Sequence, residues 1–81
     1  MAVQRTTITV LKTGLPLAGA EVIVGDVTGT ALVTDEDGVA QFGLEEGYVA
    51  YVHALVTTSP DVSVVAFLRL QAGEVHTIEI P

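Results

Sequence analysis

The sequence contains no cysteine and no tryptophan, and only three of its residues are lysine or arginine. The absence of cysteine excludes disulfides, thiolate metal ligands and cysteine nucleophiles. The three cations stand against ten acids and give a net charge of −7, so the chain offers no basic surface to phosphates. Nucleic acid and anionic membranes are therefore not expected partners. No segment approaches the roughly 18 consecutive apolar residues of a membrane helix.

The length and composition predict one small domain over residues 1–81, a size at which folding buries a comparatively low fraction of the surface. Hydrophobic residues make up 49% of the chain and the mean hydropathy is +0.58. These values are high for a soluble domain of this size, so we expect some apolar surface outside the core. The acidity is explained by solubility and self-repulsion. Residues 1–5 carry no signal-peptide core, so we expect any secretion signal in a longer parent protein.

Seven short segments alternate apolar residues with polar or β-branched ones, and turn residues separate them. The expected strands are residues 6–10, 20–24, 30–34, 39–44, 48–56, 62–70 and 75–80. Glycine and proline within residues 12–19 predict a loop there, and another turn is expected at residues 27–29. No segment has helical periodicity over a helical length, although a short helical turn near Ser59 fits the pattern. The sequence therefore predicts an all-β fold, a seven-stranded antiparallel β-sandwich.

A polar turn lies between alternating apolar residues in the segment 34–42, where Asp35, Glu36 and Asp37 precede Gly38. We expect Gly38 at positive φ, because this turn needs a residue without a strained Cβ. The three acids suggest a calcium site, but adjacent side chains on a tight turn rarely converge, and no glutamate stands at the twelfth loop position. An Asx-type turn explains the acids better.

Three motifs occur in order along most of the chain. Residues 14–24 read Gly-Leu-Pro-Leu-Ala-Gly-Ala before alternating valines, residues 34–42 hold a Thr-Asp-x-x-Gly turn followed by an aromatic residue, and residues 47–54 begin with Gly-Tyr. Together they resemble the carboxypeptidase-regulatory-like domains of the prealbumin-like (transthyretin-like) class, which are Ig-like β-sandwiches. The resemblance implies a non-catalytic accessory module of a secreted, cell-surface or virion protein. One departure is that Leu55-Val56-Thr57 replaces the glycine that usually closes the family's fifth strand.

Catalytic and metal-binding patterns are weak. His53 and His76 are far apart in the sequence and have no evident third ligand, and Ser59 and Ser63 lack the glycine pattern of a nucleophile elbow. Because of the resemblance, hydrolases of transthyretin type are also considered. They end in Tyr-Arg-Gly-Ser, and here the last two residues are Ile-Pro. We therefore expect no enzyme, no metal and no cofactor, with such a hydrolase as a remote alternative.

The period-two alternation of the strands assigns their faces. If Tyr48 points inward, as the resemblance implies, Val52 is also a core residue, and Phe42 is expected to pack with them as a dominant aromatic. The resemblance also places residues 20–24, 48–56 and 62–70 in one sheet. The outer side of that sheet is then an apolar surface and the expected binding site, made of Ile23, Val49, Tyr51, Leu55, Val65 and Phe67.

The expected function is protein binding through this surface, because aromatic residues are enriched at protein interfaces. The partner is either a second copy, giving a homo-oligomer, or a neighbouring domain. The alternative is a carbohydrate-binding module in which Tyr51 and Phe67 stack on sugar rings. Protein is favoured over carbohydrate because the surface is mostly aliphatic and offers few groups that bond to hydroxyls.

Overall fold

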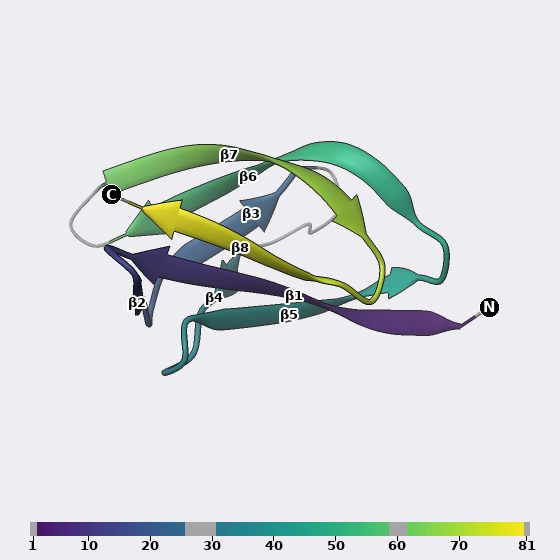
Figure 1. Cartoon of the computed structure of the whole chain (residues 1–81), viewed down its shortest axis with the longest axis horizontal. Coiled ribbons are helices and arrows are strands. Elements are labelled where there is room, and N and C mark those ends of the chain that lie inside the picture. The colour runs from purple at the N-terminus through teal and green to yellow at the C-terminus, as the bar shows by residue number, and fades with distance from the viewer. Residues whose placement is uncertain (1, 26–30, 59–61, 81) are drawn as a thin grey trace.

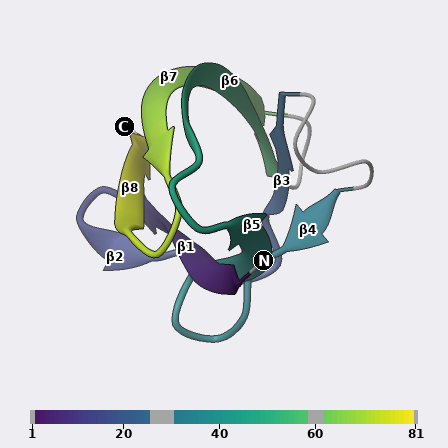
Figure 2. The same ribbon diagram turned by 90° about the vertical axis from the view of Figure 1, so that its right-hand side faces the viewer.

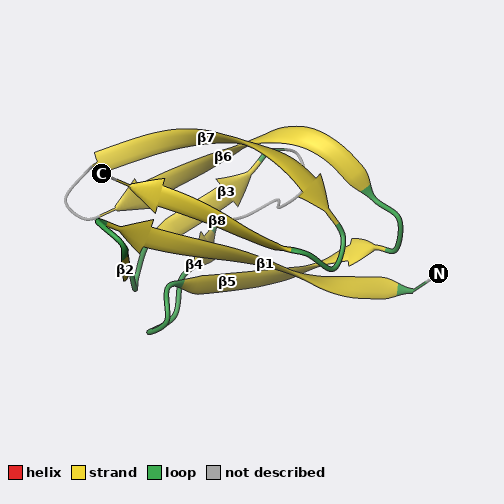
Figure 3. Cartoon of the chain, viewed as in Figure 1, coloured by secondary structure: helices red, strands yellow, loops and turns green. Residues whose placement is uncertain are grey.

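The computed structural model describes residues 2–25, 31–58 and 62–80, and all of the regular structure in them is β-strand (Figure 3). The turn expected at residues 27–29 and the helical turn near Ser59 lie outside the described residues. The strands are β1 (Val3–Lys12), β2 (Leu15–Pro16), β3 (Glu21–Val24), β4 (Leu32–Val33), β5 (Val39–Glu45), β6 (Val49–Thr58), β7 (Val62–Gln71) and β8 (Val75–Ile80).

The strands form two sheets that face each other, which confirms the prediction of an all-β, two-layer fold (Figures 1 and 2). In the first sheet β1 is central, with β5 and β2 along one edge and β8 along the other. The second sheet has the order β4-β3-β6-β7. The three segments expected to share a sheet, now β3, β6 and β7, do so.

Two details of the sandwich differ from the prediction. The described residues form eight strands, because Leu15 and Pro16, in the expected loop, pair with the end of β1. The fold is also not wholly antiparallel, because β8 runs parallel to β1. Figure 1 shows that β1, β6 and β8 point one way while β3, β5 and β7 point the other. When β8 returns to the edge of β1, the two neighbours have the same direction.

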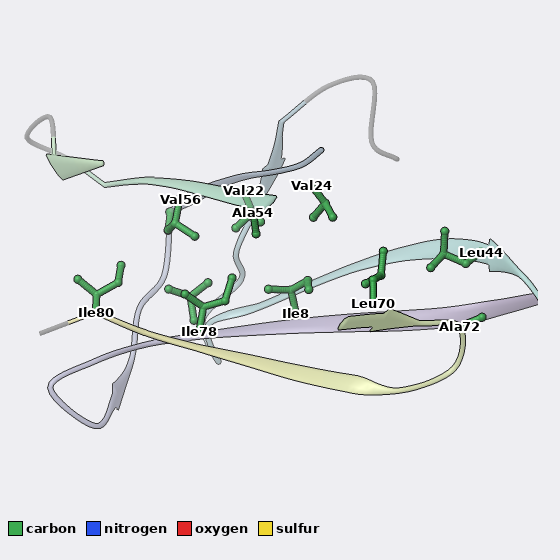
Figure 4. Close-up of a cluster of buried hydrophobic side chains, with 12 residues drawn as sticks. Ile8, Val22, Val24, Leu44, Ala54, Val56, Leu70, Ala72, Ile78 and Ile80 are labelled. Atoms are coloured by element: carbon green, nitrogen blue, oxygen red, sulfur yellow. The ribbon is translucent and has the colours of Figure 1, made fainter. Parts of the chain in front are cut away.

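The core between the sheets is aliphatic, and Figure 4 shows side chains from both sheets meeting in it. The largest completely buried apolar side chains are Ile8, Leu70, Val10, Val22, Val24 and Val56. Phe42, Tyr48 and Val52 pack against this cluster but are only half-buried, so the expectation that the aromatics dominate the core is wrong. Tyr48 precedes β6 and Phe42 lies on the edge strand β5, so both rings are at the margin of the sandwich.

The turn between β4 and β5 has the predicted geometry. Gly38 has a φ of +74°, and one oxygen of the Asp35 carboxylate accepts hydrogen bonds from the backbone N–H groups of Asp37 at 2.9 Å and Val39 at 3.0 Å. This is an Asx-type turn. The backbone N–H of Val10 donates to the carbonyl of Gly38 at 2.8 Å, so the turn lies directly against β1.

Candidate protein-binding surface

The candidate surface is the outer side of the second sheet. Successive side chains of a strand point to opposite faces, and in β6 Ala54 and Val56 are buried while Leu55 between them is exposed. The face assignment made from the sequence is therefore confirmed for this strand. All six predicted surface residues are exposed, and we call them the apolar face: Ile23, Val49, Tyr51, Leu55, Val65 and Phe67.

Cross-strand register brings three aliphatic members of the apolar face into one row. Ile23 of β3 is directly opposite Leu55 of β6, and Leu55 is directly opposite Val65 of β7. Directly opposed residues on one side of a sheet have Cβ atoms about 4.5–5.5 Å apart, so these side chains form a continuous apolar strip across three strands. Val49 is more distant, since it lies opposite Gln71 at the other end of β6.

The two aromatic members project furthest into solvent. Tyr51 is 84% exposed and Phe67 is 78% exposed, whereas Leu55, on β6 between β3 and β7, is 36% exposed. Phe67 is opposite His53, and His53 is two residues from Tyr51, so the two aromatic residues occupy diagonal positions on adjacent strands. Long side chains reach one another at such positions. The two side chains therefore lie on neighbouring positions beside the aliphatic strip.

Two polar residues share this surface and were not among the predicted site residues. The His53 and Phe67 rings are in contact, with centroids 5.0 Å apart and planes inclined by 59°. Arg69 is opposite Tyr51, and its Nη1 donates to Oε1 of Gln71 at 2.8 Å. These side chains and Tyr51 line a shallow hollow of about 280 Å³. The period-two alternation that gave the apolar residues also places both polar residues on the outer side, but only the apolar ones were predicted to bind.

Acidic residues are absent from the two long strands of this sheet. The sequence has ten Asp and Glu residues, yet none falls in residues 49–58 or 62–71. Several acids instead lie in the connections between strands, as in residues 35–37 and at Glu46 and Glu74. The protein thus combines a strongly acidic overall charge with an outer sheet face on which Glu21 of β3 is an acid, whereas β6 and β7 contribute no acid and one cation, Arg69.

The described residues bring no group of candidate metal ligands together, and the two histidines lie on different sheets. His53 is on the outer side of the second sheet, whereas His76 is on β8 of the first sheet, where its Nε2 accepts the backbone N–H of Gln71 at 3.4 Å. Within the described ranges no three His, Asp or Glu side chains are grouped closely enough to hold a metal ion. A second hollow, of about 530 Å³, is lined by residues of β1 and β5, and its one ionisable lining group is Arg5.

Comparison with known proteins gives no family for this chain: no family model and no curated protein matches it. The part of the chain that the structure describes contains no helix able to cross a membrane. Inferences about function therefore depend on the geometry and charge of the surface itself.

Proposed function

We propose that this chain is a non-catalytic interaction domain that binds protein through the apolar face. The observation that carries the proposal is the exposure of Tyr51 and Phe67, at 84% and 78%, on adjacent strands beside an aliphatic strip. Covering apolar surface is favourable by about 25 cal/mol per Å², so a partner seated here gains that free energy. Tyrosine is also enriched at binding hot spots, and phenylalanine is enriched at protein interfaces.

We further propose that the sandwich is of prealbumin-like type and belongs with the carboxypeptidase-regulatory-like domains. The strand order β4-β3-β6-β7 supports this proposal, because the strands that the resemblance places together share this sheet. The Asx-type turn at Asp35 and Gly38 supports it too. A module of this kind would serve a secreted, cell-surface or virion protein as an accessory part. Because such folds host many functions, the binding proposal depends on the surface and not on the fold.

A double charge substitution on the apolar face tests the binding proposal. We expect the variant Phe67→Glu with Tyr51→Lys to remain folded, since both side chains point into solvent, and to lose association with a partner. Light scattering over a range of concentrations measures association, and circular dichroism with thermal melting measures folding. Val75→Lys is the matched control, because Val75 is an exposed apolar strand residue of the other sheet. Association that survives the double substitution but is lost in the control would contradict the proposal.

Carbohydrate binding is the second candidate, and one observation favours it. The hollow beside Tyr51 and Phe67 also contains Arg69 and His53, whose N–H groups can donate to sugar hydroxyls while the rings stack on the sugar. NMR titration with neutral and acidic oligosaccharides distinguishes the two functions. Shifts confined to β6 and β7 that vanish in Phe67→Leu would establish the carbohydrate site, and their absence leaves protein as the ligand.

A further inference from the structure

The edge of β7 is long and unprotected. Within the described residues β7 pairs with β6 alone, over its full ten-residue length. The other edge strands are shorter: β4 has two residues, β5 has seven and β8 has six. β5 and β8 also carry Glu45 and Glu79, whereas β7 contains neither acid nor proline and has Arg69 as its one charged residue. Proteins usually protect a free edge by shortness, charge or proline, so β7 has few of the features that prevent pairing with another strand.

The hydrogen bonds around the end of β7 show which backbone groups lie on its free edge. The N–H of Ala72 donates to the carbonyl of Tyr48 at 3.0 Å, on the β6 side, whereas the N–H of Gln71 points away to His76. Successive residues of an antiparallel strand direct their N–H and C=O groups to opposite sides. The odd-numbered residues of β7 therefore direct these groups to the free edge, namely Ser63, Val65, Phe67 and Arg69.

Strand β6 gives the same assignment independently. The N–H of Gly25 donates to the carbonyl of His53 at 2.8 Å, so the odd-numbered residues of β6 face β3 and the even-numbered ones face β7. Residues 54 and 66 are directly opposite each other, which makes even-numbered residues bond across the β6–β7 ladder. The four outward residues of β7 thus combine free backbone groups with side chains on the outer side of the sheet.

The inner side of β7 is also incompletely covered. Val64, Ala66 and Leu68 point into the sandwich but are only half-buried, whereas Leu70 at the end of the strand is fully buried. β8 approaches β7 near their connecting turn, where His76 receives the Gln71 N–H. A strand added along the free edge would therefore cover apolar side chains on both sides of the sheet.

We propose that this added strand is β7 of a second copy of the chain, paired antiparallel about a two-fold axis at Ala66. The two second sheets would then form one continuous eight-stranded sheet. In this register Phe67 lies opposite Val65 of the second copy, and Arg69 lies opposite its Ser63. The inference names a partner for the interaction domain proposed above and rests on that function, but it uses the strand edge where that proposal uses the apolar face.

The edge is self-complementary in this pairing, since the same four outward residues supply both sides, and the placement of charge favours this edge and this register. Two chains of charge −7 repel each other, so they meet at least cost where acids are absent, which is along β6 and β7. A pairing centred on Arg69 would place the two guanidinium groups opposite each other, which is unfavourable. The pairing centred on Ala66 places each Arg69 against a serine and each aromatic ring against a β-branched residue, a favourable cross-strand pair.

The size of the contact predicts a reversible dimer. Residues 63–69 extend about 24 Å at roughly 3.4 Å per residue. The sandwich is about 10 Å thick, and the outward side chains add to this width. The contact therefore covers on the order of 400 Å² per copy. This is below the roughly 800 Å² per partner of a standard stable interface. Each outward pair exchanges two backbone hydrogen bonds, giving about eight in all. We therefore expect a dissociation constant in the micromolar range.

Because the chain has no cysteine, disulfide trapping gives a clean test. Ser63→Cys and Arg69→Cys proteins are oxidised separately and as an equimolar mixture. In the proposed register these positions face each other with Cα atoms about 5.5 Å apart, inside the roughly 4.4–6.8 Å range of disulfides. Residue 63 of one copy is offset by six residues from residue 63 of the other, a distance of about 20 Å, and the same holds for residue 69. We expect a disulfide-linked dimer from the mixture and little from either protein alone or from Ser63→Cys mixed with Thr77→Cys of β8.

Sedimentation velocity of edge and face variants separates this inference from the proposed function. Ser63→Pro removes an N–H that the β6 ladder does not use, and Ser63→Lys places a charge opposite Arg69 of the second copy, so each should weaken dimerisation at least tenfold; the lysine variant serves if the proline variant unfolds. Tyr51→Lys alters the apolar face one strand away from the edge. Dimerisation lost in Tyr51→Lys but retained in Ser63→Lys, or a mixture that cross-links no more than its components, would overturn edge pairing. Efficient cross-linking with dimerisation unchanged in Tyr51→Lys would support edge pairing and count against self-association through the apolar face.

Discussion

Gly38 is a residue at which a single methyl group should disrupt the fold. Its φ is +74°, and a Cβ built on it would lie 2.6 Å from the carbonyl oxygen of Val10 and 2.9 Å from the backbone nitrogen of Leu17. Both atoms belong to the backbone and bond to each other at 3.0 Å, so neither can move cheaply. We expect Gly38→Ala to lower the free energy of unfolding by more than about 2 kcal/mol, measured by urea denaturation.

Gly14→Ala is the matched control for the substitution at Gly38. Gly14 has a φ of +83°, but a Cβ there would meet no atom within 4 Å. This variant should lose only the cost of the left-handed conformation, about 1 kcal/mol. The difference between the two variants then measures the steric contact with β1 and the following loop. Equal losses would show that Gly38 does not pack against the backbone as described.

Local turn chemistry made Gly38 and Asp35 predictable, because both act on residues within four positions in the sequence. Thr34 shows what such reasoning misses. Its hydroxyl accepts the N–H of Ala20 at 2.9 Å and donates to the carbonyl of Leu17 at 2.6 Å, and so joins β4 to the loop before β3. These partners are 14 and 17 residues away in the sequence, and the alternation of the sequence does not indicate that they meet Thr34 in space.

At the scale of the strands, the direction of side chains was predictable but their depth was not. Period two fixes which residues share a face whatever the strand pairs with, so the outward positions of Tyr51 and Phe67 followed from the sequence. Burial depends on whether another strand covers the residue. Phe42 points toward the core as expected, yet it lies on an edge strand and remains half-buried.

The loss in the free energy of unfolding on substituting a core residue by alanine should follow how deeply its side chain is buried and not how large it is. Leu70 is completely buried, so Leu70→Ala should cost about 2–5 kcal/mol. Phe42→Ala should cost less, about 1–3 kcal/mol, because Phe42 is half-buried and part of its ring already contacts water. Leu55→Ala, on the outer side of the sheet, is the chemical control for Leu70 and should cost under about 1 kcal/mol. Urea unfolding measures all three, and a larger loss for Phe42 than for Leu70 would contradict the margin position of the ring.

Strand pairing was the least predictable feature at this scale. The parallel contact of β1 with β8 joins residues such as Thr7 and Val75 from opposite ends of the chain. Alternation within each strand is the same for parallel and antiparallel neighbours, so it could not reveal this pairing. For the same reason the sequence located β7 as a strand without showing that one of its edges is free.

At the scale of the whole molecule, shape and charge act together. The domain measures 39 × 21 × 20 Å, and its long axis follows the strands. The composition predicted a surplus of apolar surface, and the structure places much of it on the outer side of the second sheet. Acids at the turns and on other strands keep the protein charged, which restrains indiscriminate aggregation while leaving that surface open to a partner.

The dependence of self-association on salt tests this combination. Each copy carries a charge of −7, and at about 10 mM salt the Debye length of roughly 30 Å is comparable to the 39 Å length of the domain, so two copies repel over their whole surface. At about 150 mM salt the screening length falls to roughly 8 Å and most of this repulsion is removed, while apolar and backbone contacts are little affected. We therefore expect the association constant from sedimentation equilibrium to rise several-fold between these conditions. A constant that falls with salt would mean that ion pairs between copies hold the assembly, which is incompatible with a contact through the acid-free strands β6 and β7.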